Sequence, residues 1–461
     1  MNQVDPTEQP EAWPRVLFIT PCAFNSVTGG GVTFSNLFRG WPKDRLACVS
    51  SDNFPVSRAV CDHYYMLGSN ECVSAWPWSV LRPSRAKAKI DPQPDGAEDA
   101  RRDGSDASCA SSDSPAEASF PKRIARRLLG TAGLPVRGAL SSDLRNWVAD
   151  FKPELIYTIL GDVSILDLVE QIADAFDLPI VIHCMDDGVT EPRRTGLYGR
   201  WFNRTYRSGL SRLLPRAADR LAICDAMADV YAQRYGQPFG SFHNAVDVAH
   251  IAERHRPLAG RNTPPRLIYV GSLYPIAQDR SLLDLCEAVA RLNVSGQPVE
   301  LGVYASRQLF GRYVPQVERH AGCTFHDALD DDAWFFEAIA SADGLVLPVN
   351  FDAASRQYVG LSMPTKVPAY LASGTPTLVY GPGSVAQVHD ARNMGWGLVV
   401  DQQDPAALDT AIRRLLGEAE LRQTLVDRSL KLAYDHHDAP EVRRRLRDTL
   451  RRATTFGNDS Q

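Results

Sequence analysis

Short apolar runs alternate with segments of helical spacing along this chain, and the alternation begins twice. The first series includes Arg15–Thr20, residues 155–160 and residues 178–183, and a second series starts at residues 266–271. Strands that alternate with helices form parallel sheets covered by helices on both faces. Each series therefore predicts a doubly wound domain. We expect an α/β protein with two Rossmann-like domains that face each other across a cleft.

Length and local composition set the expected boundaries of these domains. The chain has 461 residues, more than a single hydrophobic core usually spans. Residues 84–120 are rich in Ala, Ser, Asp, Pro and Gly and contain almost no large apolar side chain, which is typical of a disordered insert. The expected order is a loose tail at 1–13, an N-terminal domain at 14–255 that contains the insert, a linker at 256–265, a C-terminal domain at 266–435, and a helix and tail at 436–461.

Charge and cysteine content narrow the class of protein. The net charge is −5, so the chain as a whole is not suited to bind polyanions, and we expect no nucleic-acid partner. No apolar run reaches the ~18 residues of a membrane-spanning helix, and none follows a basic start as in a signal peptide. The nine cysteines form no Cys-x-x-Cys pair, a pattern that favours reduced thiols and predicts a cytoplasmic protein.

A basic segment at 121–129 adds a second possibility for the location. Four cations there are interleaved with Ile124, Leu128 and Leu129. A basic amphipathic helix of this kind can lie on an anionic membrane surface, which would place the protein at the inner face of the membrane. A solvated helix that packs on the domain fits the same residues equally well.

Three consecutive glycines come after the first predicted strand. Gly29, Gly30 and Gly31 precede residues 34–38, which have helical spacing. A strand, a Gly-rich loop and a helix let backbone N–H groups approach a phosphate or a sugar closely. A flexible turn is the alternative interpretation.

Three polar residues lie at the end of a later predicted strand. His183 ends the run 178–183, and Asp186 and Asp187 follow it. In an open parallel sheet, ligands bind outside the carboxyl ends of the strands. A neutral histidine can accept a proton there and a carboxylate can orient a hydroxyl group, so these residues are candidates for chemistry. Asp-Asp-Gly is also ordinary turn sequence.

The segment 361–382 predicts a loop, a short helix, a tight turn and a buried strand. Thr365 is the expected N-cap, and Gly374 lies where a helix ends in a left-handed residue. Lys366, at the start of the helix, adds a full positive charge to the partial charge of the helix N-terminus. That combination suits a phosphate, and an ordinary surface lysine is the alternative.

Together these segments resemble a GT-B glycosyltransferase and, within that fold, glycosyltransferase family 4. The resemblance covers roughly Arg15 to Leu450 apart from the insert. The matching segments are Gly29–Gly31, His183 with Asp186, Phe242–Asp247 (similar to N-G-V-D), Leu267–Gly271, Ser341–Pro348 (similar to x-A-D-x-x-x-x-P) and Tyr370–Pro376 (similar to A-M-A-x-G-x-P).

The resemblance implies that the second domain holds a nucleotide sugar, such as a UDP or GDP sugar. The sugar would pass, with retention of configuration, to a saccharide or lipid-linked acceptor on the first domain, in cell-surface polysaccharide or glycolipid synthesis. No metal and no cofactor are implied. The expected catalytic residues are His183, Asp186, Arg280 and Lys366, and the expected substrate-binding residues are Gly29, Gly30, Gly31, Asp187, Asn244, Gly271, Ser272, Asn350, Asp352, Pro364 and Thr365.

Two of these assignments concern the charge on the leaving diphosphate. Arg280 aligns with the lysine of the basic pair that family members use there, if two extra residues are allowed, and Ser272 stands where the family has an arginine. From its charge and position we infer that Lys366 supplies the missing cation. Developing phosphate charge in a dry site requires fixed cations and dipoles.

The sequence departs from the family at its paired glutamates. Leu361 and Ala369 occupy the positions of the family's E-x7-E motif, whose second glutamate normally holds the ribose hydroxyl groups. Asn350 or Asp352 are the expected substitutes.

The missing glutamates keep a second class of function open, a catalytically weakened GT-B protein that acts as a scaffold or partner subunit. A sugar-nucleotide epimerase is a further alternative, which would bind the donor but lack the acceptor-side glycines. A nicotinamide oxidoreductase is disfavoured, because neither half has G-x-G-x-x-G with an acidic residue ~20 positions later.

Overall fold

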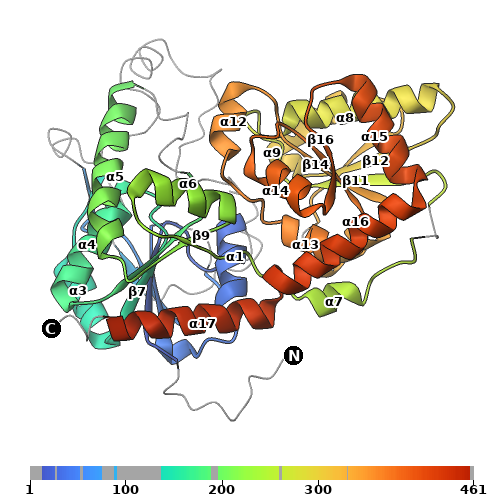
Figure 1. Cartoon of the computed structure of the whole chain (residues 1–461). Helices are drawn as coiled ribbons and strands as arrows, with labels where there is room; N and C mark the ends of the chain where they lie inside the picture. The colour runs from blue at the N-terminus through green and yellow to red at the C-terminus, as the bar shows by residue number, and fades with distance from the viewer. Residues whose placement is uncertain are drawn as a thin grey trace. The chain divides into compact units, whose positions relative to one another are not determined.

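The computed structural model describes residues 13–25, 28–51, 56–74, 88–90, 136–187, 196–258, 262–329 and 331–456. The chain divides into an N-terminal unit, residues 1–242 with 443–461, and a C-terminal unit, residues 243–442 (Figure 1). The sequence placed these divisions at 255 and 435. Residues 243–255 belong instead to the C-terminal unit, because Val248 and Ile251 of the short helix α7 (Val248–Ala252) lie in its core.

The N-terminal unit is built on an eight-stranded sheet. Its strand order is β10-β9-β8-β7-β1-β2-β3-β5, and all neighbours are parallel except β3 and β5. The strands are β1 (Val16–Thr20), β2 (Leu46–Ser50), β3 (His63–Met66), β5 (Lys89–Ile90), β7 (Leu155–Thr158), β8 (Ile180–Cys184), β9 (Asp219–Ala222) and β10 (Gly240–Ser241). Every residue of β1, β2 and β7 is buried, as expected for parallel strands covered on both faces.

Helices cover this sheet on both faces (Figure 1). They are α1 (Gly29–Phe38), α3 (Ser142–Phe151), α4 (Val163–Phe176), α5 (Gly196–Arg216), α6 (Asp225–Tyr235) and α17 (Ala439–Phe456), with a 3-10 turn at Lys43–Arg45. Leu446 and Leu450 of α17 are fully buried. The first residues of α17 belong to the C-terminal unit and the remainder to the N-terminal unit.

The C-terminal unit contains a six-stranded, fully parallel sheet in the order β13-β12-β11-β14-β15-β16. The strands are β11 (Arg266–Val270), β12 (Glu300–Tyr304), β13 (Cys323–His326), β14 (Gly344–Pro348), β15 (Thr377–Tyr380) and β16 (Gly397–Val400). The helices after α7 are α8 (Asp279–Val294), α9 (Arg307–Phe310), α10 (Val314–Glu318), α11 (Asp332–Ser341), α12 (Ala353–Val359), α13 (Val367–Ala372), α14 (Ala386–Met394), α15 (Pro405–Gly417) and α16 (Ala419–Leu432). A 3-10 helix lies at Gly311–Tyr313 and a π-helix at Ala433–His437.

In each sheet the strand order reverses beside the first strand of the unit. The first strand, β1 or β11, has its successor on one side, and the chain later returns to its other side with β7 or β14. Helices on opposite faces leave a crevice at the carboxyl ends of such a strand pair. The edges after β1 and β7, and after β11 and β14, are therefore where ligands are expected.

Several local expectations need correction. The three glycines do not form a loop, because α1 already begins at Gly29, with Thr28 as its N-cap. Lys366, not Thr365, is at the N-cap of α13 and makes no side-chain cap there. Gly374 does adopt the predicted left-handed conformation, with φ of 71°.

Other expectations fall largely outside the described residues. Segment 121–129 and most of 84–120 lie there, although Lys89–Ile90 form the edge strand β5. Within the described parts, no helix is both long and apolar enough to cross a membrane.

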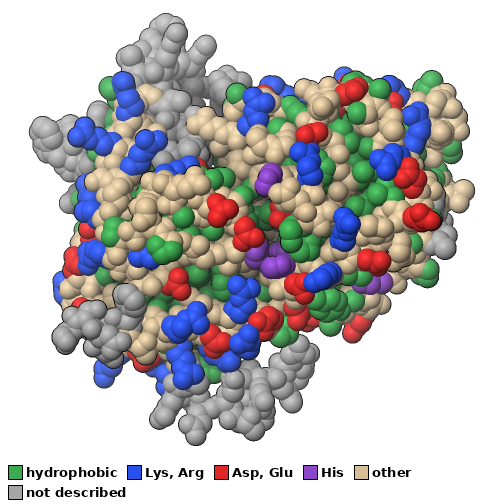
Figure 2. All heavy atoms as spheres, viewed as in Figure 1, with side chains coloured by type: hydrophobic (Ala, Val, Ile, Leu, Met, Phe, Trp, Pro, Cys, Tyr) green, Lys and Arg blue, Asp and Glu red, His purple; other side chains and the backbone are tan. Residues whose placement is uncertain are grey.

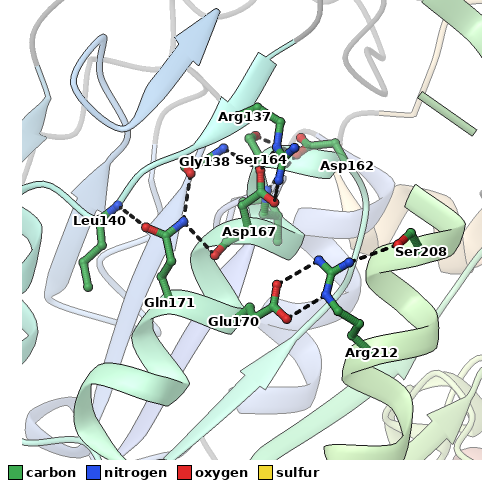
Figure 3. Close-up of polar contacts among 11 residues, drawn as sticks. Arg137, Gly138, Leu140, Asp162, Ser164, Asp167, Glu170, Gln171, Ser208 and Arg212 are labelled. Carbon is green, nitrogen blue, oxygen red and sulfur yellow. Dashed lines mark hydrogen bonds and ion pairs between the residues drawn. The ribbon is translucent and has the colours of Figure 1, made fainter. Parts of the chain in front are cut away.

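A polar face of α4 holds strand β6 (Val136–Gly138), which pairs with β4 (Cys72–Ser74) (Figure 3). Asp167 accepts hydrogen bonds from Arg137 Nε at 2.6 Å and from the Gly138 amide at 3.0 Å. Gln171 donates to the Gly138 carbonyl at 2.9 Å. A Cβ atom on Gly138 would lie 2.1 Å from the Ser164 carbonyl oxygen, so only glycine permits this approach.

We expect Gly138→Ala to push β6 away from α4 and to destabilise the N-terminal unit by about 2 kcal/mol. The midpoint of its thermal unfolding should fall by about 5 °C. Gly240→Ala is the matched control, because no atom lies closer than 4.0 Å to a Cβ there. Equal midpoints for the two variants would contradict the close-approach argument.

Candidate functional site

Lys366 reaches the carboxyl end of β11, at the point where the strand order of the C-terminal unit reverses. Its Nζ donates a hydrogen bond to the Val270 carbonyl oxygen at 2.7 Å and lies 4.1 Å from the centroid of the Tyr269 ring. Gly271 follows with φ of 138°, and a Cβ on it would lie 2.5 Å from Nζ. Gly271 thus leaves the space that the lysine head group occupies.

The ammonium of Lys366 is poorly compensated. It makes no ion pair among the described residues, and its one hydrogen bond uses one of three donor hydrogens. Desolvation by burial lowers the pKa of Lys366 to about 7. A desolvated cation without a counter-ion is the electrostatic situation in which a bound anion is most strongly favoured.

Tyr370 completes this arrangement and was missed by the sequence reasoning. Its hydroxyl accepts a hydrogen bond from the Val270 amide at 3.1 Å, so Tyr370 and Lys366 hold the N–H and the C=O of the same residue, in two successive peptide units. The two residues are four positions apart, a spacing that places them on one helix face. That spacing was the available signal.

A pair of oppositely charged residues lies at the starts of the helices that follow β11 and β14. Arg280, in the first turn of α8, has Nη1 4.0 Å from Oδ2 of Asp352, and its side chain is 69% exposed. Asp352 caps α12 by accepting from the Ser355 amide at 3.0 Å. Burial opposes ionisation of Asp352, but the bonds from Ser355 and the charge of Arg280 lower its pKa below the usual value. The pair joins the helices that follow β11 and β14.

Asn350 braces this edge internally. It is fully buried, and its amide nitrogen donates to the Pro275 carbonyl at 3.2 Å and to Asp279 Oδ1 at 3.0 Å. Its side-chain oxygen accepts from the Ser281 amide at 3.1 Å. Both amide hydrogens are therefore used within the protein, which leaves Asp352 as the better placed of the two expected ribose substitutes.

The remaining predicted residues of this unit have local structural roles. The Ser272 carbonyl accepts the Tyr269 hydroxyl, and the Pro364 carbonyl accepts the Val367 amide at 3.0 Å. Thr365 is exposed. Leu361 is partly buried and Ala369 buried, so neither family glutamate position provides a polar group.

Asn244 begins the C-terminal unit and has an unusual environment. It is only 5% exposed, yet neither polar atom of its side chain has a hydrogen-bond partner among the described residues. Its carbonyl is bonded to His437 Nδ1 at 2.8 Å. Desolvation, aided by the charge of His243, lowers the pKa of His437 to about 3, so this histidine is neutral.

In the N-terminal unit, the loops after β1 and β7 meet at the reversal of strand order. A Cβ on Gly161 would lie 2.5 Å from Cγ of Pro21, and this contact was not anticipated from the sequence. The first turn of α1 begins nearby in the chain, where Thr28 accepts from the Gly31 amide at 3.1 Å. Gly31 faces the Asn25 side chain too closely for any Cβ, whereas Gly30 has room.

His183 is buried in the sheet instead of exposed at its edge. It is 0% exposed, with Nδ1 2.6 Å from the Tyr157 hydroxyl and ring contacts to Phe34 and Phe242. Burial raises the pKa of Tyr157, so its hydroxyl stays protonated. Asp186, three residues later, is exposed.

Asp187 is tied to α6. Its carboxylate accepts from Arg234 at 2.8 and 3.0 Å and from the Tyr231 hydroxyl at 3.0 Å. Asp187 therefore has an internal ion pair. His183 lies inside the protein, whereas Asp186 is exposed at its surface. In the described residues, no group of three or more His, Cys, Asp or Glu side chains is arranged to hold a metal ion.

The pKa of Lys366 predicts a pH-dependent stability. Between about pH 7 and 10.5 the unfolded chain holds one more proton than the folded one, so the folded state gains stability as pH rises. Below this range the full cost of the buried charge remains. We therefore expect Lys366→Met to stabilise the C-terminal unit most near pH 7 and to lose that advantage by up to about 1.4 kcal/mol per pH unit as pH rises.

Urea unfolding at a series of pH values measures this difference. Lys431→Met is the control, since Lys431 is an exposed lysine paired with Asp435. Parallel pH profiles for wild type and Lys366→Met would show that the ammonium is not desolvated.

Comparison with known proteins places a family match on the C-terminal unit. The family model described as Glycosyl transferases group 1 matches residues 264–418, roughly a third of the chain. No curated protein sequence matches the chain.

Solved structures resemble the whole chain in fold. Sucrose-phosphate synthase from Thermosynechococcus elongatus has 13% identity and a TM-score of 0.59, over 96% of this chain and 100% of that one. HepE from Anabaena, in complex with UDP and glucose, has 12% identity and a TM-score of 0.55, over 95% and 99%. Trehalose 6-phosphate synthase from Burkholderia multivorans has 12% identity and a TM-score of 0.56, over 97% and 98%. The chain has their GT-B fold of two Rossmann-like domains.

Proposed function

We propose that this protein is a glycosyltransferase that moves a sugar from a nucleotide sugar to a saccharide or lipid-linked acceptor, with retention of configuration and without a metal or cofactor. The observation that carries the proposal is the uncompensated ammonium of Lys366 at the carboxyl end of β11. The match of residues 264–418 to a glycosyltransferase family model supports it independently.

The chemistry of the donor explains why such a cation is useful. When the sugar leaves a nucleoside diphosphate, negative charge grows on the phosphate oxygens, and a fixed cation in a dry site stabilises it more than water does. Lys366 needs an anion to complete its hydrogen bonds, and binding a diphosphate would return its pKa toward the ordinary range. Arg280, exposed on α8, supplies a second cation at the adjacent strand end.

The identity of the donor is proposed from two sources. HepE was solved with UDP, glucose and UDP-glucose, which favours a UDP sugar here. Asp352, 30% exposed at the start of α12, is the carboxylate we assign to the ribose in place of the family glutamates. Each oxygen of this carboxylate accepts one hydrogen bond from Ser355, and a carboxylate oxygen can accept a second one, here from a ribose hydroxyl.

On the acceptor side we assign Gly29, Gly30 and the exposed Asp186 to sugar contacts. His183 is fully buried, so its assignment as a catalytic residue requires the α1 region to open or the substrate to reach between Phe34 and Phe242. We place the reaction in the cytoplasm, at the inner face of the membrane when the acceptor is lipid-linked, within the synthesis of a cell-surface polysaccharide or glycolipid.

One observation favours a second candidate function. Leu361 and Ala369 leave the two family glutamate positions without a carboxylate, and Asn350 is fully engaged in the brace. A GT-B scaffold that binds a partner and does not turn over would tolerate these losses.

Donor binding separates the two candidates. We expect one nucleotide sugar of the UDP, GDP or ADP series, present at 100 times its Kd, to raise the free energy of unfolding by about 2.7 kcal/mol. The midpoint of thermal unfolding should then rise by about 5 °C. Lys366→Met should abolish this shift and lower turnover about a hundredfold, because it removes a cation from the leaving group.

Lys431→Met is again the control, with the same charge change on the exposed surface of α16. No shift with any nucleotide sugar for wild type would favour the scaffold. Full turnover in Lys366→Met would reject the phosphate role while leaving the fold assignment intact.

A further inference from the structure

Helix α5 (Gly196–Arg216) presents a row of cations along one face. Leu197, Arg200, Arg204, Arg207 and Ser211 are all exposed and follow a spacing of three and four residues. The buried residues of the helix, such as Tyr206, Leu210 and Leu213, lie on the opposite face. The row spans about 21 Å along the helix axis. Figure 2, viewed as Figure 1, shows Lys and Arg side chains gathered over this helix.

No ion pair among the described residues neutralises the three arginines in the middle of this row. Helix α5 has five arginines and no acidic residue. The two arginines at its C-terminal end pair with α4, Arg212 with Glu170 at 2.9 Å and Arg216 with Asp174. Within the described part of the chain, Arg200, Arg204 and Arg207 make no ion pair.

The other arginine-rich helix provides an internal comparison. On α17, Arg443 donates to the Asn36 carbonyl at 2.8 Å, Arg444 pairs with Asp448 at 3.0 Å, and Arg447 covers the ring of Trp13 at 4.9 Å. Arg443 and Arg447 thus contact other parts of the N-terminal unit, and Arg444 pairs within α17. Among the described residues, these three arginines of α17 have partners, whereas Arg200, Arg204 and Arg207 of α5 are exposed and make no ion pair.

We propose that this face of α5 docks on an anionic lipid bilayer. A row of exposed cations attracts the phosphate-bearing headgroups of anionic lipids, and each arginine near such a surface strengthens binding. Leu197, 55% exposed at the start of the row, can enter the headgroup boundary. Helix α5 is a different part of the sequence from segment 121–129.

The remaining chemistry argues for a membrane over a nucleic acid. The chain carries a net charge of −5, so a long polyanion that follows the protein surface meets repulsion outside this row. A flat bilayer can contact the exposed face of α5 without following the rest of the surface. No exposed aromatic residue stands within the row to stack on bases.

Co-sedimentation of the full chain with vesicles tests the proposal. We expect binding to vesicles that contain one third phosphatidylglycerol, weak binding to pure phosphatidylcholine, and loss of binding as salt rises from about 0.05 M to about 0.5 M. The triple variant R200Q/R204Q/R207Q should bind about a hundredfold more weakly, since each arginine contributes about five-fold.

Two matched variants and a comparison with a DNA duplex test whether binding depends on this row and on lipid. R39Q/R413Q/R451Q removes the same charge at exposed positions elsewhere and should bind as wild type does. R200K/R204K/R207K keeps the charge and should retain binding, and circular dichroism checks that all variants fold. The proposal would be overturned by equal binding to both vesicle types or by equal loss of binding in the two glutamine variants. It would also be overturned if the protein bound a DNA duplex more tightly than vesicles and this binding required Arg200, Arg204 and Arg207. The inference does not depend on the proposed transfer reaction.

Discussion

The reversal of strand order beside β1 and β11 is the constraint on which the functional geometry of this protein depends. A parallel sheet can place loops from neighbouring strands at one edge only where the chain has wound in both directions from the same strand. In the C-terminal unit this brings Lys366 to the end of β11 and Asn350 to the end of β14, although 16 positions of chain separate them. In the N-terminal unit it brings Pro21 against Gly161.

Lys366 illustrates how a candidate site retains an unfavourable interaction. A buried ammonium with one carbonyl acceptor costs stability, and Gly271 with its positive φ adds a backbone conformation that other residues rarely adopt. Helix α13 supports both features, because its Tyr370 bonds the amide of Val270, the residue whose carbonyl accepts from Lys366. Such unsatisfied charge is common where a ligand completes the site, which is why we give this lysine more weight than the exposed Arg280.

Arginine content alone does not report function in this chain. The basic stretch on α17 and the basic row on α5 look alike in composition, yet their surroundings differ. Asn36 and Trp13 contact arginines of α17, whereas Glu170 and Asp174 of α4 reach only the last two arginines of α5. Overall net charge averages over these contexts, so a local surface can attract an anion that the whole chain would repel.

The sequence by itself determined the α/β class, the two Rossmann-like domains and the strands that begin each of them, because apolar runs such as Arg266–Val270 depend on local hydrophobicity and bounding turns. It also singled out Lys366. It did not foresee α5, whose helical face is interrupted by arginines, nor that α1 would include all three glycines. Only the tertiary structure decided that His183 is buried against Tyr157, that Asp187 pairs with Arg234 and that Asn350 is a brace. Each of these depends on partners distant in sequence, and a side chain's role follows from those partners more than from its own chemistry.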